Sequence, residues 1–173
     1  RLFDMAREVG CPVFLDIGAN FGLYSVHAAL GGAFEAVHAF EPDPRNLACF
    51  RANLHLNGAL EGVSVHEIAL SEKDGTVSFA SGGDAFTGQS RIVPPKTSDS
   101  IEIPARRLDS ILRPGDGLCI KIDVEGHELA VLEGARGLLE RKTWVIQVEC
   151  LIESGDQVGD FLSTLGGSLQ GQI

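Results

Sequence analysis

The first residues able to do chemistry are a carboxylate and the small residues that follow it. Asp16 lies near the end of an apolar run over residues 13–17, and Gly18, Asn20 and Gly22 follow before a helical pattern that reaches Leu30. Glycine has no Cβ, so the backbone can turn sharply there and approach a ligand closely. The following helix directs free N–H groups and the positive end of its dipole toward the same place. This stretch predicts a loop that receives the charged part of a ligand.

A second carboxylate, Glu41, closes the next apolar run, over residues 36–40. Residues at helical spacing lie between the two runs, which predicts a strand–helix–strand unit. In such units the glycine loop and the second carboxylate bind a nucleoside together, and the carboxylate accepts both ribose hydroxyls. We therefore expect Glu41 to be a ribose ligand.

The spacing of the loop distinguishes between two kinds of nucleoside site. Read as G-x-G-x-x-G, the dinucleotide pattern, the loop has Asn20 and Leu23 where two of the three glycines belong. Read as D-x-G-x-N-x-G from Asp16, it resembles the E/D-x-G-x-G-x-G loop of class I S-adenosylmethionine (SAM) methyltransferases. Asn tolerates left-handed backbone angles, so Asn20 is a mild replacement for the middle glycine. Asp16 would repel a pyrophosphate but attract a methionine ammonium and a sulfonium.

Asp123, Glu125 and His127 form a second group of ionisable residues, at the end of an apolar run over residues 118–124. Methylation of a hydroxyl needs a base as the oxygen attacks, and each of the three residues could serve. Carboxylates with a histidine could also hold a divalent metal, but no ligand spacing here is diagnostic. Strand alternation places Lys121 on the same face as Asp123. We expect a buried lysine there, neutralised by a neighbouring carboxylate.

The remaining pattern predicts an α/β fold with a Rossmann-like, doubly wound, mostly parallel sheet. Apolar strand-like runs alternate with helical segments, and such units join through right-handed crossovers. Four carboxylates then stand at carboxyl ends of strands, on the edge where ligands of such sheets bind. They are Asp16, Glu41, Asp123 and Glu149.

We expect residues 1–173 to form a single domain, with residues 1–12 as a lead-in and residues 81–100 as a flexible loop. That loop is rich in Gly, Pro and Ser, and Phe86 is its one large aromatic residue. We expect the loop to cover the acceptor, and residues 101–103 to pair back on the strand at residue 76. The count of elements predicts a sheet of order 3-2-1-4-5 with six strands or fewer, truncated after the sixth. An unpaired edge would then favour a homodimer, or the native chain continues.

Composition narrows the partners and the compartment. The chain has 173 residues, 44% hydrophobic and 22% charged, with a formal net charge of −10. The few basic residues are scattered, so we expect no nucleic-acid partner. No apolar run is long enough to predict a membrane span. The four cysteines show no C-x-x-C spacing, and three lie in predicted helix or strand, which favours buried free thiols and a cytoplasmic protein.

Several linked motifs resemble the FkbM-type methyltransferases. The matching segments are Asp16-Ile17-Gly18-Ala19-Asn20, Tyr24-Ser25, Phe40-Glu41-Pro42, Lys121-Ile122-Asp123-Val124-Glu125-Gly126-His127-Glu128 and Val131-Leu132-x-Gly134-Ala135. The resemblance implies SAM-dependent O-methylation of a sugar, glycan or natural-product hydroxyl on a class I methyltransferase fold. It implies that Asp16, Gly18, Asn20 and Gly22 form the SAM loop, Glu41 the ribose site, and Ile68 and Ala69 the adenine side. Asp123 and Glu125 match the acidic motif facing the acceptor.

Two other functions stay open from the sequence. An NAD-dependent oxidoreductase would share the strand–helix–strand unit, although the third glycine and a Tyr-x-x-x-Lys pair are missing. A non-catalytic nucleoside-binding domain has no positive signal in its favour. The methyltransferase interpretation is preferred because several motifs support it together.

Overall fold

The computed structural model describes residues 1–82, 90–113, 117–141, 143–150 and 152–166, with residues 152 and 153 described by their backbone alone. The prediction that Phe86 contacts the acceptor falls outside these residues. None of the helices in the described ranges combines the length and the apolar composition needed to cross a membrane.

The main sheet has five parallel strands among the described residues, in the order β3-β2-β1-β8-β9. This is the predicted order 3-2-1-4-5. The strands are β1 (Val13–Ile17), β2 (Ala36–Phe40), β3 (Ser64–His66), β8 (Leu118–Asp123) and β9 (Trp144–Glu149). β1 and β8 are buried along nearly their whole length, as expected for central strands that are covered on both faces.

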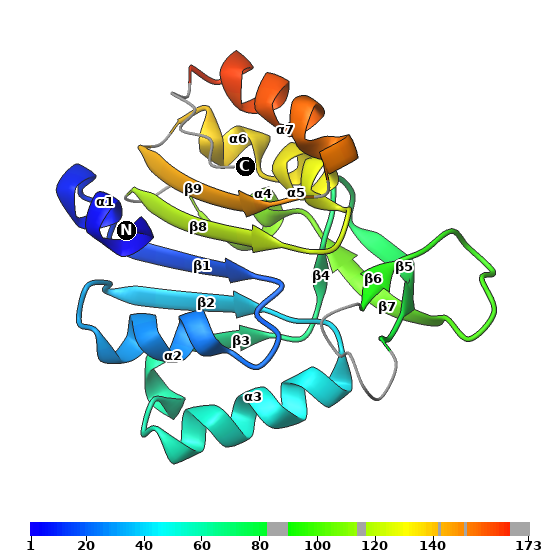
Figure 1. Ribbon diagram of the computed structural model, residues 1–173, viewed down its shortest axis with the longest axis horizontal. Helices are drawn as coiled ribbons and strands as arrows, with labels where there is room; N and C mark the ends of the chain where they lie inside the picture. Colours follow the sequence, from blue (N-terminus) through cyan, green and yellow to red (C-terminus); the bar gives the residue numbers. More distant parts are fainter. Residues whose placement is uncertain (83–89, 114–116, 142, 151, 167–173) are drawn as a thin grey trace.

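Helices cover both faces of this sheet, so the doubly wound prediction is confirmed (Figure 1). α1 (Leu2–Val9), α2 (Leu23–Leu30) and α3 (Pro44–Leu56) pack around one core, which includes Phe14, Phe50 and Cys119. The other core includes Leu15, Ile120 and Leu132. It is shared with α4 (Leu108–Ile111), α5 (Glu128–Gly134), α6 (Arg136–Leu139) and α7 (Ile152–Thr164). Neighbouring strand residues alternate between the two cores because successive side chains point to opposite faces.

A second, smaller sheet stands at the carboxyl ends of the main strands (Figure 1). Its order is β4-β7-β5-β6, formed by β4 (Ala69–Leu70), β5 (Gly75–Ala80), β6 (Arg91–Ile92) and β7 (Ile101–Arg106). β5 and β7 are antiparallel, with Val77 opposite Ile103, so the predicted hairpin is confirmed. The expectation that all of residues 81–100 form a loop is wrong, because β6 pairs antiparallel with β5.

The helical segment after Gly126 is divided into α5 and α6 at Ala135. Gly134 ends α5 where the backbone packs against Ser71: an added Cβ would lie 2.1 Å from the Ser71 carbonyl oxygen. The break therefore accommodates the close approach of the chain beside β4. A short 3₁₀ helix, η1 (Leu60–Gly62), precedes β3.

The cysteine prediction is confirmed in part. Cys11 and Cys119 are buried free thiols, whereas Cys49 is exposed on α3 and Cys150 is partly exposed. Burial raises the pKa of the Cys119 thiol to about 12, so this side chain behaves as an apolar core residue.

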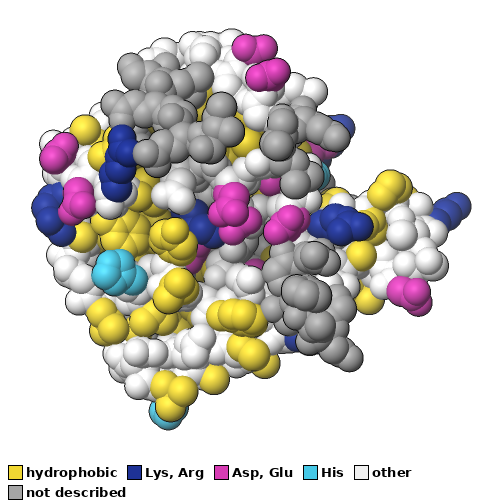
Figure 2. Space-filling view, in the orientation of Figure 1, with side chains coloured by type: hydrophobic (Ala, Val, Ile, Leu, Met, Phe, Trp, Pro, Cys, Tyr) yellow, Lys and Arg dark blue, Asp and Glu magenta, His cyan; other side chains and the backbone are white. Residues whose placement is uncertain are grey.

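Hydrophobic side chains gather on the surface over α2, where Leu23 and Leu30 are exposed (Figure 2).

Candidate functional site

The loop between β1 and α2 is built from left-handed backbone conformations. φ is 76° at Gly18, 52° at Asn20 and 78° at Gly22. Gly18 passes directly beside the end of β8: a Cβ there would lie 1.8 Å from the carbonyl oxygen of Asp123. A side chain at Gly22 would overlap the Phe50 ring of α3 at 2.0 Å. Both glycines are therefore required by packing as well as by backbone angle.

Asp16 lies beneath this loop rather than in the pocket above it. Its side chain is fully buried, and its Oδ2 accepts hydrogen bonds from the Ser25 backbone N–H (3.0 Å) and the Ser25 hydroxyl (2.6 Å). α2 begins after Gly22, which has no side chain to cap it, so the Asp16 carboxylate supplies that hydrogen bond. Burial raises the pKa of this carboxyl, and the bonds from Ser25 and the charge of Lys121 oppose the shift.

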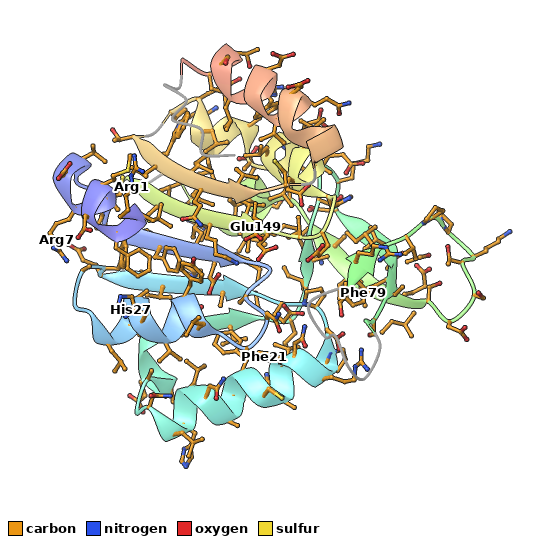
Figure 3. All side chains as sticks on the ribbon, viewed as in Figure 1. Arg1, Arg7, Phe21, His27, Phe79 and Glu149 are labelled. Atoms are coloured by element: carbon orange, nitrogen blue, oxygen red, sulfur yellow. The ribbon has the colours of Figure 1, made fainter. Side chains whose placement is uncertain are left out.

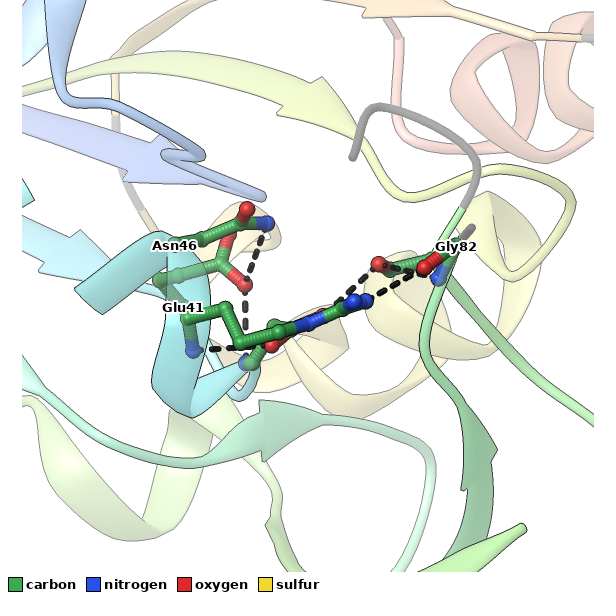
Figure 4. Close-up of polar contacts among 6 residues, drawn as sticks. Glu41, Asn46 and Gly82 are labelled. Carbon is green, nitrogen blue, oxygen red and sulfur yellow. Dashed lines mark hydrogen bonds and ion pairs between the residues drawn. The ribbon is translucent and has the colours of Figure 1, made fainter. Parts of the chain in front are cut away.

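Glu41 stands at the end of β2 and is tied to the loop. Its Oε2 accepts from the Asn20 backbone N–H at 2.8 Å. Its Oε1 accepts from the Asp43 backbone N–H at 2.8 Å and from the Asn46 side-chain amide at 3.3 Å (Figure 4). The residue is 4% exposed, and burial raises the pKa of its carboxyl. Glu41 is thus held in one orientation by donors from the loop and from α3.

A pocket opens above Glu41, between the carboxyl edge of the main sheet and the small sheet. Two buried oxygens of pocket-lining residues, Asn20 Oδ1 and Asn46 Oδ1, have no hydrogen-bond partner among the described residues. Unpaired buried acceptors are costly, so they mark a place where donor groups of a ligand would be stabilised. The lining includes Ile17, Gly18, Asn20, Phe40, Glu41, Pro42, Asn46, Ile68, Ala69, Leu70, Phe79, Ser90, Arg91, Ile92, Asp123, Val124, Glu125, His127 and Glu149.

The small sheet supplies a second wall of the pocket, and residues 90–92 of this wall belong to the segment 81–100 that was expected at the acceptor. Phe79 of β5 and Ile92 of β6 line the pocket, which Glu149 lines from the end of β9 (Figure 3). The segment before β6 is joined to the start of α3, because the Ser90 hydroxyl donates to Asp43 Oδ2 at 2.8 Å. The segment around Ser90 carries no periodic sequence signal, so its position beside α3 follows only from the fold.

The opposite end of the pocket is acidic. Asp123 accepts an ion-pair contact from Lys121 (Nζ to Oδ2, 3.1 Å), which confirms the predicted neutralised lysine. Glu125 has a left-handed φ of 54° and an exposed side chain. Partial burial raises the pKa of its carboxyl, and the nearby charges of Asp123 and Glu149 raise it further. Arg91 is the cation among the described pocket-lining residues.

His127 lies at the same end of the pocket and is joined to Ser71 and, through Ser71, to Glu72. Its Nε2 is 2.9 Å from the Ser71 hydroxyl, which donates to Glu72 Oε2 at 2.6 Å. Burial lowers the pKa of the His127 ring, whereas the charges of Glu72 and Glu128 oppose the shift. Ser71 lies within no motif of the sequence analysis and reaches His127 only through the fold.

The structure brings most of the expected site residues together around one pocket. Gly18, Asn20, Glu41, Ile68, Ala69, Asp123, Glu125 and His127 all line it. Asp16 and Gly22 are not among the lining residues, and both act on the loop from below. In the described part of the chain, no group of three His, Cys, Asp or Glu side chains is arranged to hold a metal ion.

The five-stranded parallel sheet and the nucleoside-type loop at its carboxyl edge define the class I methyltransferase fold. A family model described as "Methyltransferase FkbM domain" matches residues 16–166. The chain therefore belongs to the FkbM methyltransferase family, as the motifs predicted.

Comparisons with individual proteins agree with this assignment. "Methyltransferase sdnD" of Sordaria araneosa is 28% identical over 91% of this chain and 71% of its own length. "2-O-methyltransferase NoeI" of Sinorhizobium fredii is 30% identical over 78% of this chain and 61% of its own. The crystal structure of an FkbM methyltransferase from Methylobacillus flagellatus superimposes with a TM-score of 0.63 at 24% identity. That alignment covers 88% of this chain but 37% of the solved one.

Proposed function

We propose that this chain is an SAM-dependent O-methyltransferase acting on a hydroxyl of a sugar, glycan or natural product. The observation that carries the proposal is the placement of Glu41, a buried and oriented carboxylate beside a glycine loop, in a pocket whose other end holds Asp123, Glu125 and His127. Family membership supports methyl transfer, and the similarity to the 2-O-methyltransferase NoeI of Sinorhizobium fredii supports oxygen as the methylated atom.

The residues at the Glu41 end suit the nucleoside part of SAM. Glu41 Oε1 accepts two hydrogen bonds from the protein, whereas Oε2 accepts one and retains acceptor capacity for a ribose hydroxyl. Asn20 Oδ1 and Asn46 Oδ1 are buried acceptors without partners among the described residues, and they would meet further donor groups. Ile68 and Ala69 provide apolar surface for the adenine ring. In this proposal Asp16 and Gly22 position the loop and do not touch the cofactor.

The residues at the other end suit a hydroxyl acceptor. When bound, SAM supplies an electrophilic methyl group on a sulfonium. Asp123, Glu125 and His127 stand where a base could remove the acceptor proton. Glu125 and Glu149 raise the negative charge of this wall, so we favour an uncharged acceptor over an anionic one.

We further propose that residues 1–173 act as one methyltransferase domain in the cytoplasm, without a nucleic-acid partner. All four cysteines are free in the structure, which suits a reducing compartment. The net charge of −10 disfavours binding to a phosphate backbone.

Incubation with methyl-labelled SAM and a panel of sugar and polyketide alcohols tests the proposal. We expect label in an acid- and base-stable methyl ether of at least one alcohol, together with S-adenosylhomocysteine. Label in an amine, or S-adenosylhomocysteine binding with no transfer to any hydroxyl across a broad panel, would contradict O-methylation.

A further inference from the structure

Ser71, Glu72 and His127 form a chain of hydrogen bonds that leads from the pocket to the protein surface. His127 lines the pocket, Ser71 is buried, and the Glu72 side chain is 37% exposed. The Ser71 hydroxyl lies 2.9 Å from His127 Nε2 and 2.6 Å from Glu72 Oε2. Ser71 directly follows β4, and Gly134 fixes its backbone from the other side. The chain therefore has a defined geometry.

The direction of these hydrogen bonds fixes the tautomer of His127. The bond from Ser71 keeps the pKa of the Glu72 carboxyl low, so Glu72 is an acceptor only. A serine hydroxyl has one hydrogen, and Ser71 gives it to Glu72. The contact with His127 must then be a donation from Nε2–H to the Ser71 oxygen. In the neutral ring, the lone pair of Nδ1 remains as the acceptor.

Burial of the His127 ring favours the unprotonated form at neutral pH. Burial lowers the pKa of His127, and two acidic residues, Glu72 on the hydrogen-bond chain and Glu128 at the start of α5, counteract the shift. Asp123 ends β8, and Glu125 lies on the loop between β8 and His127. His127 is the N-cap residue of α5, but its side chain accepts no hydrogen bond from the N–H groups of the helix. The ring nitrogens are therefore not used for capping.

We propose that His127 accepts the proton of the acceptor hydroxyl on Nδ1 and that Ser71 and Glu72 are positioning residues for it. The inference rests on the proposed O-methyltransferase function. The acceptor oxygen forms a bond to the methyl carbon as the bond from that carbon to the sulfur of SAM breaks. The electron pair of the broken bond stays on sulfur, and the hydroxyl proton moves to Nδ1. The resulting imidazolium is stabilised through Ser71 by the Glu72 carboxylate, the arrangement in which a third group orients a base.

The two carboxylates nearby are less well placed to act as the base. Asp123 is paired with the Lys121 ammonium at 3.1 Å, so its Oδ2 is already engaged by the protein. The exposed Glu125 side chain has no hydrogen bond within the described ranges that would orient it. Of the three, His127 alone is hydrogen-bonded to a buried hydroxyl among the described residues, that of Ser71.

The first test does not depend on turnover. In the cofactor-free protein at neutral pH, the ¹⁵N chemical shifts of the His127 ring should report hydrogen on Nε2. In Ser71→Ala that preference should weaken, and in Glu72→Gln the ring should titrate at lower pH because a neighbouring negative charge is gone. An Nδ1–H tautomer in the wild type, or a titration unaffected by Glu72→Gln, would overturn the inference.

The second test uses three variants. His127→Gln keeps an amide donor for Ser71 but removes the base, and kcat should fall about 10²- to 10⁴-fold. Ser71→Ala should lower kcat about tenfold, since it loses a hydrogen bond to a group that becomes charged. Glu72→Gln should move the acidic limb of the kcat/KM profile to lower pH, because protonated His127 is inactive and becomes easier to deprotonate. A merely structural role would lower the rate without moving that limb. The exposed residues His55 and Glu61, changed to Gln, are the matched controls.

The outcomes distinguish a failure of the proposed methyltransferase function from a failure of the proposed role of His127. Each variant is also titrated with S-adenosylhomocysteine, and we expect wild-type affinity in all three. A wild type that neither binds it nor transfers methyl groups refutes the proposed function. A wild type that does both, with His127→Gln at wild-type kcat, refutes only the role of His127.

Discussion

Glu41 both receives hydrogen bonds from the glycine loop and faces the pocket. Glu41→Ala should weaken S-adenosylhomocysteine binding by roughly 10- to 100-fold, because removing a charged hydrogen-bonding partner costs about 1.5–3 kcal/mol. Calorimetry measures the affinity, and Glu35→Ala, an exposed glutamate on the loop before β2, is the control. Wild-type affinity in Glu41→Ala would remove Glu41 from the ribose site.

The contribution of the buried Asp16 carboxyl to folding stability should depend on pH. Because burial raises the pKa of this carboxyl, the folded state holds the proton more tightly than the unfolded state. The contribution of Asp16 to stability is therefore greatest below the ordinary aspartate pKa and falls as pH rises through the folded pKa. Asp16→Asn cannot ionise and still offers an acceptor to Ser25. The Tm of Asp16→Asn relative to wild type should rise between about pH 3 and about pH 7.

Two comparisons check the Asp16 prediction. Asp160→Asn, at an exposed position on α7, controls for the loss of a surface carboxylate. A Tm difference for Asp16→Asn that is constant with pH, or that falls as pH rises, would show that burial does not dominate at Asp16.

The loop between β1 and α2 depends on close approach as well as on backbone angle. Gly18→Ala adds a Cβ 1.8 Å from the Asp123 carbonyl oxygen at a φ of 76°, so the ends of β1 and β8 must separate. Gly32→Ala adds a Cβ at a φ of 61° with nothing within 4 Å. Gly32→Ala should cost about 1–2 kcal/mol of unfolding free energy and Gly18→Ala about 2–5 kcal/mol. Equal losses in denaturant titrations would show that the contact with Asp123 is not tight.

Sequence patterns predicted the main sheet well because each signal there is local. Apolar runs that end on carboxylates identified β1, β2 and β8, and parallel strands bring such ends to one edge. β6 was missed because a two-residue strand has no periodicity. The break between α5 and α6 has no local sequence signal, because it accompanies a long-range contact of Gly134 with Ser71.

Some residues of the candidate site were likewise predictable from local sequence patterns, and others were not. Gly18, Asn20, Glu41, Asp123 and His127 follow strand ends or precede helices, so spacing alone proposed them. Asn46, Ser90 and Ser71 lie in the pocket or touch it only through tertiary contacts. Asp16 was expected to attract the methionine ammonium, a role in which it would line the pocket. The structure instead shows its carboxylate bonded to Ser25 beneath the loop.

The charged residues at the acidic end of the pocket predict which acceptor the enzyme prefers. Glu125 and Glu149 line the pocket at the ends of β8 and β9, and Arg91 lines it from the small sheet. kcat/KM should be higher for a neutral glycoside than for the matching uronate, because the carboxylates repel an anion. Glu149→Gln should reduce the ratio of kcat/KM for the neutral glycoside to kcat/KM for the uronate, because one repelling carboxylate is removed. A uronate preferred by the wild type would contradict the charge argument.

The predicted edge-paired dimer stays a prediction. β3 and β9 are the outer strands of the main sheet among the described residues, and α1 packs against β9. Light scattering on the purified chain would measure the oligomeric state directly.

The central claim is that the pocket at the carboxyl edge of the main sheet binds SAM through Glu41. Calorimetric titration of the wild-type chain with S-adenosylhomocysteine, and separately with NAD, tests this claim most directly. We predict saturable one-to-one binding of S-adenosylhomocysteine that Glu41→Ala weakens, and no heat of binding from NAD. Binding of NAD without any response to S-adenosylhomocysteine would contradict the account.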